Sequence, residues 1–353
     1  MRTRDPARSG LHSRMTTRLS AIPHPPIELM QRVGRIDDGD VAAGYEQVGR
    51  HCRARIDRLL PADWSWEGRR VLDFGCGAGR TLRHFRAEAE NAEFHACDID
   101  EASIAWLDAH LSPPFRVVQN SEKPRLPHPS GFFDLVYAFS VFTHLAESSA
   151  AWLLELHRVL KPEGLLISTF LNEGSMPLFG GGEWEEDRIG MNVLGRWKEW
   201  DSGGPIVFHS EWWLREHWGR AFDVLTIERY DPQEHESLHL GQGCVVMRAR
   251  PNPPDAGELM RPGSDPRELA ALRHNVEQLQ READELFDHL SQTTEARQAL
   301  AREVERLHSE LEKARSELAS ANDSLATIAG SQSWRLTAPL RAGAAVLRTR
   351  GNR

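Results

Sequence analysis

Cysteine is scarce in this sequence, with four among 353 residues. Cys52, Cys76, Cys97 and Cys244 are scattered, so they offer neither the paired spacing of a zinc site nor a dense disulfide framework. The sequence also lacks a His-Glu-x-x-His motif and a cluster of carboxylates that would hold a catalytic metal. The scattered cysteines predict a reduced, cytoplasmic compartment, and no metal site is expected.

Long apolar runs and an excess of positive charge are also missing. No apolar stretch approaches the ~20 residues that a membrane-spanning helix needs, and the basic residues 1–20 lack the apolar run of a secretory signal. A formal net charge of -9 disfavours a general nucleic-acid-binding protein, which needs a basic surface against phosphates. The 40% of hydrophobic residues is typical of a soluble globular protein.

The sequence does contain a regular alternation of strand-like and helix-like segments after residue 68. This pattern is typical of a parallel sheet with helices on both faces. Two later strand-like segments, 221–230 and 242–250, are expected to close the sheet. The expected fold class is therefore α/β, with a doubly wound, mostly parallel sheet of seven strands. The alternating segments are 69–75, 80–89, 92–99, 101–111, 115–120, 132–140, 149–160 and 164–170.

Composition divides the chain into five parts. Residues 1–22 are Arg-rich and without period, which predicts disorder, and residues 23–250 hold the globular domain with helices at its N-terminal end. Residues 251–267 form a Pro- and Gly-rich linker. A coiled coil over 268–329 and a basic amphipathic tail over 330–353 follow.

The expected coiled coil rests on apolar residues that recur at alternating steps of three and four. Only Thr293 and Arg297 interrupt this seam. Such regularity favours burial against a partner helix, so we expect a homo-oligomer, with a lone solvated helix as the alternative. The seam positions are Leu269, Leu272, Val276, Leu279, Ala283, Leu286, Leu290, Thr293, Arg297, Leu300, Val304, Leu307, Leu311, Ala314, Leu318, Ala321, Leu325 and Ile328.

The stretch "VLDFGCGAGR", residues 71–80, places three glycines behind a short apolar strand. A strand that turns through Gly75, Gly77 and Gly79 into a helix is expected to offer bare backbone N–H groups to a ligand. This turn alone is weak evidence, because tight strand-to-helix turns also use glycine for geometry. Asp98 lies about 20 residues downstream of this turn. In nucleotide-binding α/β folds, an acid at this spacing accepts the hydrogens of the ribose hydroxyls. Together they predict an adenosine-type ligand.

Four segments follow one another in a fixed order: "VLDFGCGAGR", "HACDID", "VVQNSEKPRLPHPSGFFDLVYAFSVFTHL" and "HRVLKPEGLLIST". They resemble the successive motifs of class I S-adenosylmethionine-dependent methyltransferases over about residues 41–250. The resemblance implies a Rossmann-like methyltransferase fold and S-adenosyl-L-methionine as the cofactor. Methyl transfer from a sulfonium is an in-line displacement, for which a protein mainly aligns the reactants and removes a proton.

The resemblance also implies the roles of individual residues. Asp73 would lie near the methionine end of the cofactor, above the loop of Gly75, Gly77 and Gly79. Asp98 would hold the ribose, and Ile99 would pack on the adenine.

Two further positions lie at the ends of the third and fourth strands. Asn120 and Ser121 stand where the family usually has an acid and a small residue that read the adenine edge, so this sequence departs from the pattern there. Phe139 and Ser140 end the fourth strand, where the family's backbone commonly meets the methionine amino group.

Two histidines are candidates for a general base toward the acceptor. His144 follows the fourth strand, at the sheet edge where ligands collect, and His209 precedes a helix that Ser210 is expected to cap. Imidazole has a suitable pKa for this role, although a hydrogen-bonded structural histidine is the alternative at each position.

Tryptophan is concentrated between the fifth and sixth strands, where the family forms its acceptor pocket. These aromatic faces are suited to stack on a sugar ring, and packing, above all of Trp212 and Trp213, is the alternative. The tryptophans are Trp184, Trp197, Trp200, Trp212, Trp213 and Trp218.

The end of the chain, "SQSWRLTAPLR", resembles a short sequence found in bacterial surface-polysaccharide glycosyltransferases and their associated methyltransferases. It implies a glycan or other small-molecule acceptor, methylated at the cytoplasmic face of the membrane. The basic, Trp-containing tail suits peripheral contact with an anionic membrane, and a frayed basic tail is the alternative.

Two other function classes stay open from the residues alone. One is a coiled-coil scaffold or length-measuring module with a vestigial cofactor domain, which intact Asp73, glycines and Asp98 argue against. The other is a nicotinamide-dependent oxidoreductase, whose Gly-x-Gly-x-x-Gly fingerprint fails here because Arg80 holds the place of the last glycine.

Overall fold

The computed structural model describes residues 22–32, 39–180, 182–233 and 240–343. The chain divides into two compact units, residues Met1–Gln278 and Leu279–Arg353. The N-terminal residues 1–21, for which the sequence predicts disorder, and the end of the tail, 344–353, lie outside the described residues.

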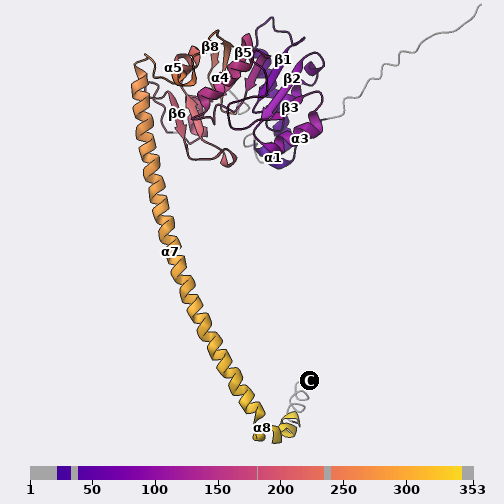
Figure 1. The fold of residues 1–353 in the computed structure, drawn as a ribbon, viewed down its shortest axis with the longest axis vertical. Coiled ribbons are helices and arrows are strands. Elements are labelled where there is room, and N and C mark those ends of the chain that lie inside the picture. The colour runs from indigo at the N-terminus through magenta and orange to yellow at the C-terminus, as the bar shows by residue number, and fades with distance from the viewer. Residues whose placement is uncertain (1–21, 33–38, 181, 234–239, 344–353) are drawn as a thin grey trace, which may run out of the picture. The chain divides into compact units, whose positions relative to one another are not determined.

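The first unit is built on one sheet of seven strands (Figure 1). The five strands from β3 to β5 in spatial order run parallel to one another, and β9 is antiparallel to both β5 and β8. The predicted seven-stranded, mostly parallel sheet is therefore confirmed. In spatial order the strands are β3 (Arg116–Gln119), β2 (Glu93–Asp98), β1 (Arg70–Phe74), β4 (Phe133–Ala138), β5 (Leu160–Phe170), β9 (Gly243–Ala249) and β8 (Phe222–Glu228).

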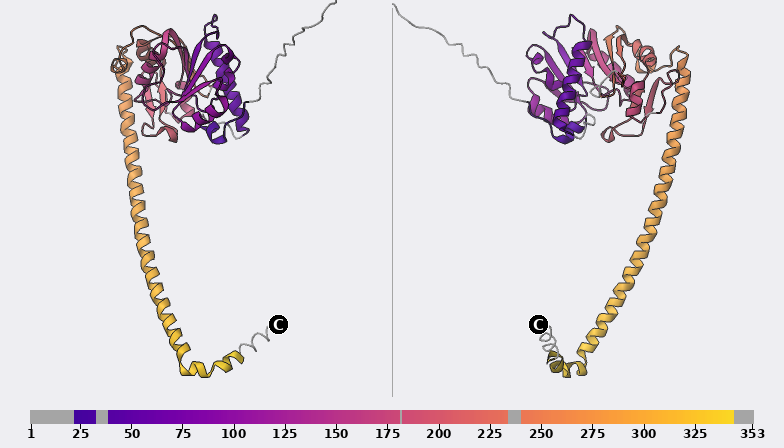
Figure 2. Two further views of the ribbon diagram at one scale, coloured as in Figure 1. Left: turned by 45° about the vertical axis from the view of Figure 1, so that its right-hand side comes forward. Right: turned by 180° about the vertical axis from the view of Figure 1, so that it is seen from behind.

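Helices cover both faces of this sheet (Figure 2). Because side chains alternate along a strand, Leu72 of β1 belongs to one apolar core and Val71 to the other. The first core contains side chains of α4 (Ser149–Val159) and α5 (Glu211–His217). The second contains side chains of α2 (Val41–Leu59) and α3 (Glu101–Leu111), and the short α1 (Ile27–Gln31) precedes α2.

The helix expected over residues 80–89 is replaced by two short 3₁₀ turns. These are η1 (Leu82–Phe85) and η2 (Glu88–Glu90). Leu82 and Phe85 are both fully buried, and a 3₁₀ turn brings residues three apart onto one face. The buried Arg83 between them donates to the carbonyl oxygens of Ile22 and Pro23, which ties this segment to the N-terminal residues.

The Trp-rich insertion between β5 and β8 forms a small subdomain that the sequence did not predict. It contains η3 (Glu173–Leu178), η4 (Trp200–Ser202) and the antiparallel pair β6 (Met191–Leu194) and β7 (Ile206–His209). A short 3₁₀ turn, η5 (Trp218–Arg220), follows α5. The subdomain has its own apolar cluster, made of Leu171, Met176, Ile189 and Phe208.

The Pro- and Gly-rich segment after β9 is packed on the first unit rather than being a free tether. It forms α6 (Ala256–Leu259), whose Leu259 is fully buried in the core. Arg220 donates to the carbonyl oxygens of Glu258, Leu259 and Arg261. The predicted linker is therefore a connector with a fixed path.

The long helix α7 (Arg267–Gly330) begins inside the first unit. Gln278 donates from its amide nitrogen to the Val193 carbonyl oxygen at 2.7 Å and accepts from Asn192. The buried His217 contacts Glu268 at 3.0 Å. The first three turns of the expected coiled coil are thus attached to the first unit.

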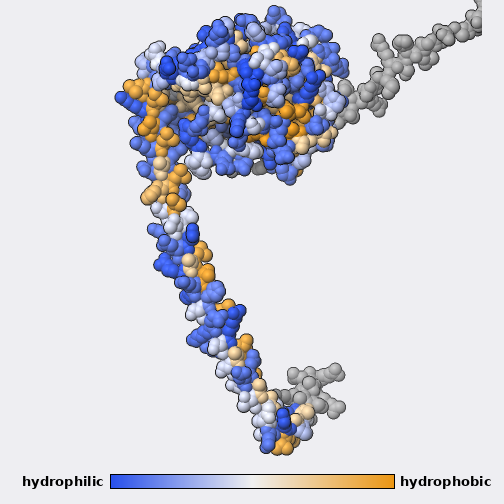
Figure 3. Space-filling model, viewed as in Figure 1, coloured by the Kyte–Doolittle hydropathy of each residue, from blue (hydrophilic) through white to orange (hydrophobic). Residues whose placement is uncertain are grey.

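The second unit consists of α7 from Leu279 onward and the short α8 (Gln332–Leu336). Apolar residues recur along α7 among charged ones (Figure 3), and the seam leucines are exposed in the single chain. No helix within the described residues has both the length and the apolar character needed to cross a membrane.

Candidate cofactor and active site

The glycine bend of residues 75–79 lies where the strand order reverses between β1 and β4, the position where doubly wound sheets bind ligands. Gly75, Gly77 and Gly79 have φ values of 76°, 50° and 78°, which residues with a side chain rarely adopt. A Cβ on Gly75 would lie 2.3 Å from Cγ2 of Val141. The bend is therefore packed directly against the segment that follows β4.

The expectation that this bend offers free backbone N–H groups is wrong for its first three amides. The N–H groups of Gly75 and Cys76 donate to the Cys97 carbonyl oxygen at 2.8 and 3.1 Å. The Gly77 N–H donates to Oδ2 of Asp98 at 2.7 Å. These amides continue the hydrogen bonds between β1 and β2, so the glycines provide space rather than donors.

Asp98 lies at the end of β2 with its carboxylate facing the bend. Oδ2 accepts from Gly77, and Oδ1 accepts from the Asp100 N–H at 2.9 Å. Burial raises the pKa of this carboxyl above its usual value. An ionised carboxylate has about four acceptor positions, and the backbone N–H groups of Gly77, Ile99 and Asp100 occupy three of them, so one stays available for a ligand hydroxyl.

Asn120 provides an unsatisfied acceptor beside Asp98. Its backbone N–H donates to the Asp98 carbonyl oxygen at 3.1 Å, and its Nδ2 donates to the carbonyl oxygen of the exposed Ser121 at 3.0 Å. Its Oδ1 is buried and has no partner among the described residues. Buried polar atoms are normally paired, so this oxygen fits a ligand N–H such as the exocyclic amine of adenine. Ile99, which follows Asp98 in the chain, is half-buried and accepts from Gln119 through its carbonyl oxygen.

We expect Asn120→Leu to weaken cofactor binding about tenfold, because the amine that Asn120 Oδ1 accepts from would lose its partner. Asn120→Asp keeps an acceptor at this position and is the matched control, with affinity close to that of the parent. Equilibrium titration with S-adenosylhomocysteine measures both. Equal affinity for the leucine variant would remove Asn120 from the site.

Asp73 is almost fully buried at the end of β1. Tyr137, its register partner on β4, donates its hydroxyl to Oδ2 at 3.0 Å. Burial nevertheless raises the pKa of Asp73 to about 8, so the carboxyl is mainly protonated at neutral pH. Sequence reasoning missed Tyr137, because only the register between two parallel strands brings it to Asp73.

The end of β4 is held in an unusual conformation next to the bend. Ser140, which follows the nearly buried Phe139, has φ 59°, a left-handed value that is rare outside glycine. Its N–H donates to Oγ1 of Thr169 at 2.7 Å, and its hydroxyl pairs with the Gln242 side chain. Strained backbone of this kind is found at functional sites, where surrounding contacts maintain it.

His144 lies in the turn after Val141 and has the geometry of a neutral base. Its Nδ1 lies 2.9 Å from the Pro205 carbonyl oxygen. A carbonyl can only accept, so Nδ1 carries the hydrogen and Nε2 of the neutral ring keeps its lone pair. Burial lowers the pKa of His144, which keeps the ring neutral at pH 7.

His209, the second candidate base, is enclosed in the core. It has no exposed surface, and neither ring nitrogen has a partner among the described residues. It packs between Trp213 and Trp218, and burial lowers its pKa to about 3. A ring without access to solvent or substrate cannot relay a proton, so the structure disfavours the catalytic role. Ser210 does cap α5, by accepting from the Trp213 N–H.

Five of the six tryptophans of the insertion separate into two groups. Trp212, Trp213 and Trp218 are buried in the main core, which favours the packing interpretation for them. Trp197 and Trp200 are 61% and 47% exposed. The turn that contains Trp200 lies against His144, since a Cβ on Gly204 would be 3.7 Å from Trp200 Cα and 3.6 Å from His144 Nδ1.

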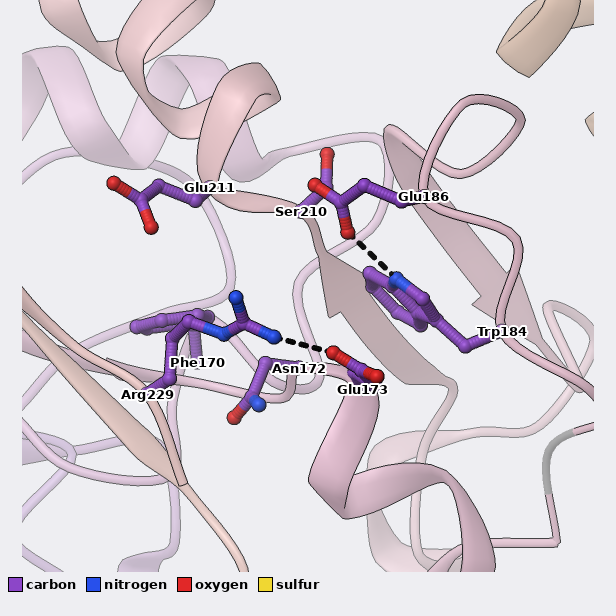
Figure 4. A pocket seen from close by; sticks show the side chains of 8 residues that line it. All are labelled: Phe170, Asn172, Glu173, Trp184, Glu186, Ser210, Glu211 and Arg229. Carbon is purple, nitrogen blue, oxygen red and sulfur yellow. Dashed lines mark hydrogen bonds and ion pairs between the residues drawn. The ribbon is translucent and has the colours of Figure 1, made fainter. Parts of the chain in front are cut away.

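Trp184 lines a small cavity at the end of β5 (Figure 4). Its Nε1 donates to Glu186 at 2.8 Å, and across the cavity Arg229 pairs with Glu173. The cavity encloses about 10 Å³, which is room for about one water molecule. It is therefore too small to receive a sugar ring in this conformation.

Comparison with known proteins identifies one segment of the chain. Residues 72–168 match the family described as "Methyltransferase domain". A ubiquinone biosynthesis O-methyltransferase of Cereibacter sphaeroides is 30% identical over 130 residues, which are 36% of this chain and 51% of the relative. A malonyl-[acyl-carrier protein] O-methyltransferase of Salmonella typhimurium is 29% identical over 139 residues, 39% and 53% of the two chains. The chain spans about half the length of these curated relatives.

Among solved structures, a 1,6-didemethyltoxoflavin-N1-methyltransferase of Burkholderia thailandensis is 19% identical and has a TM-score of 0.40. The match covers 58% of this chain and 78% of that one. The motif order and the matched family agree for residues 72–168, which include β2, β3 and β4 of the seven-stranded sheet. Residues 72–168 are thus similar to a methyltransferase domain, and the enzyme class and cofactor expected from the sequence, S-adenosylmethionine-dependent methyl transfer, agree with this similarity.

Proposed function

We propose that this protein is an S-adenosylmethionine-dependent O-methyltransferase that acts on a glycan or other small-molecule hydroxyl in cell-surface polysaccharide biosynthesis. The observation that carries the methyltransferase assignment is the convergence of Asp98, the unpaired Oδ1 of Asn120 and the glycine bend at one sheet edge. His144 stands in the turn that continues from this edge.

The residues at this edge suit S-adenosylmethionine, which supplies a methyl group activated on a sulfonium when it is bound. Asp98 would accept from the ribose hydroxyls, and Asn120 from the adenine amine. Asp73 would face the cationic methionine end. His144 Nε2 would take the proton from the attacking hydroxyl, and the shielded position of its ring would limit competition from water.

An oxygen acceptor is supported by the two curated relatives, whose names both specify O-methylation. The exposed Trp197 and Trp200 beside the His144 turn support a sugar, because indole faces stack on the apolar faces of sugar rings. The short tail sequence 331–341 supports a surface polysaccharide. The direct test incubates the protein with methyl-labelled cofactor and with fractions of cell-envelope glycans, small metabolites and proteins. Label in the glycan fraction supports the proposal, and label only in another fraction contradicts the acceptor class.

We expect His144→Ala to lower kcat by about 10²- to 10⁴-fold, the usual contribution of a general base, while cofactor affinity stays within about twofold. In the parent, kcat/KM should rise with pH through an ionisation below pH 6.5, because burial lowers the pKa of His144. His209→Leu is the matched control and should keep kcat. A kcat unchanged by loss of the His144 imidazole would contradict its role.

The tail is proposed to bring the protein to the cytoplasmic face of an anionic membrane. Within the described residues, Trp334, Leu336 and Leu340 are exposed apolar side chains in the second unit. The Arg341 guanidinium lies 3.6 Å above the Trp334 ring. Aromatic and cationic side chains in this combination suit the membrane interface, and co-sedimentation of the full chain with anionic, but not neutral, vesicles tests it.

A further inference from the structure

The seam of α7 is an unpartnered apolar face with a defined register. Written as heptads, its a positions include Leu290, Val304 and Leu311, and its d positions include Leu286 and Leu300. In the single chain Leu290 and Leu300 are 65% and 67% exposed. A face of this kind gains stability only when another surface covers it.

The first turns of α7, residues 268–278, leave this apolar face uncovered. The buried or hydrogen-bonded residues that attach α7 to the first unit include Glu268, Ala271, Asn275 and Gln278, which occupy the g and c positions of the heptads. The a and d positions of the same turns are exposed, as Leu269 and Leu272 illustrate. The first unit therefore holds one side of the helix, and the seam remains free for a partner.

We propose that this partner is the α7 of a second copy, in a parallel, in-register coil of two strands. The inference deepens the homo-oligomer that the sequence predicts, and its tests do not depend on methyl transfer. Flanking charges are the argument for a second copy in this orientation, since e and g residues determine orientation in coiled coils. Because the methyltransferase domain precedes the coil in each chain, a parallel pair holds two such domains at one end.

In a parallel pair each g residue faces the e residue five positions later on the partner helix. Glu303 then faces His308 of the second copy, and Glu310 faces Arg315. Glu282 and Glu317, the other acidic g residues after position 278, face Phe287 and Asn322. No like charges meet along the flanks.

In an antiparallel pair g faces g and e faces e. The register that places the two polar seam residues together, Thr293 against Arg297, also places Glu282 against Glu310 and Arg273 against Arg315. Like charges that face each other at these positions are destabilising. The parallel pair instead brings Arg297 of both copies to one a layer, where their long side chains reach solvent past Ala296.

Two strands are favoured by the seam itself. Most d positions in the first two-thirds of the helix are leucine, and valine occupies a positions 276 and 304, a combination typical of dimers. A single polar residue at an a position, here Arg297, also determines register and oligomeric state at some cost in stability.

Disulfide trapping in the full-length protein tests the orientation. Ala314→Cys places a thiol at a d position, and Ser309→Cys places one at an f position that points away from the seam. The four native cysteines are buried, so the unmodified chain gives the background. We expect mild oxidation to convert most of the Ala314→Cys protein, but not the Ser309→Cys protein, to a covalent dimer.

An antiparallel pair would put the two copies of residue 314 roughly 60 Å apart, so failure of this variant to cross-link would overturn the proposal. Sedimentation equilibrium measures the mass of the assembly and so determines the number of helices in the coil. A mass of two chains is expected, and a mass of one or three chains would also overturn it.

A charge cycle on the same full-length protein provides an independent test. In the parallel pair, Glu310→Arg and Arg315→Glu should each weaken dimerisation about fivefold, and the double reversal should lose less than the product of the two. Within the helix Glu310 pairs with Arg306 and Arg315 pairs with Glu312. The loss of these pairs affects each single variant and the double variant alike, so it does not contribute to the coupling energy. In an antiparallel pair each single reversal would replace a like-charge contact by an opposite-charge one. Stronger dimerisation in both single variants, with no coupling between them, would therefore contradict the proposal.

Discussion

Asp98→Ala should weaken binding of S-adenosylmethionine about tenfold to a hundredfold. The carboxylate keeps an acceptor position for the ribose, and loss of a charged contact to the ribose costs about 1.5–3 kcal/mol. Calorimetric titration with S-adenosylhomocysteine measures the change without turnover. Asp108→Ala, which removes an exposed acid of α3, is the matched control and should bind like the parent.

The alanine variant also leaves the N–H groups of Gly77 and Asp100 without their acceptor. A thermal melt therefore has to accompany the titration. Asp98→Asn retains an acceptor for one of these amides while it loses the charge, and it should bind more weakly than the parent even where it folds normally. Parent-like affinity in both folded variants would refute the location of the ribose site.

Asp73→Asn should make the empty protein more stable at pH 7, by about 2–4 kcal/mol. The pKa of Asp73 is raised to about 8 by burial, whereas the same carboxyl in the unfolded chain ionises near pH 4. Between these values the folded state holds a proton that the unfolded state releases, so stability falls as pH rises. Denaturant unfolding at pH 4 and pH 7 should show the advantage of the variant at pH 7 alone.

The same substitution should weaken cofactor binding, because a cationic methionine end favours the ionised form of Asp73. Binding to the parent at pH 7 should accordingly release a proton, which appears as a heat that depends on the ionisation enthalpy of the buffer. Asp73→Asn should abolish that dependence. A variant that binds and releases protons like the parent would separate Asp73 from the cofactor site.

The sheet could be predicted from the sequence because each of its strands is a short apolar run between turn residues. Asp73 and Asp98 end two such runs, and parallel strands bring their carboxyl ends to one edge, so their proximity followed from the order of the motifs. Asn120 was expected at this edge from the family resemblance. Its unpaired Oδ1 could not be foreseen, since it depends on the rotamer that Ser121 fixes.

The misplaced features depend on contacts between distant segments. His209 and His144 look alike in sequence, but Trp213 and Trp218 enclose only the first. The amides of the glycine bend are paired because β2 ends beside them, which needs the strand register. Pro- and Gly-rich composition predicted a linker, and the contacts of this segment with the first unit, through the buried Leu259 and the Arg220 guanidinium, depend on residues distant in sequence.

The central claim is that the glycine bend and Asp98 form a binding site for an S-adenosyl cofactor. Calorimetric titration of the unmodified protein with S-adenosylmethionine and, separately, with NAD tests it most directly. We expect saturable binding of the sulfonium cofactor with one site per chain and no heat from the nicotinamide. Absence of heat and of any melting shift at millimolar S-adenosylmethionine would contradict the claim and favour a scaffold with a vestigial domain.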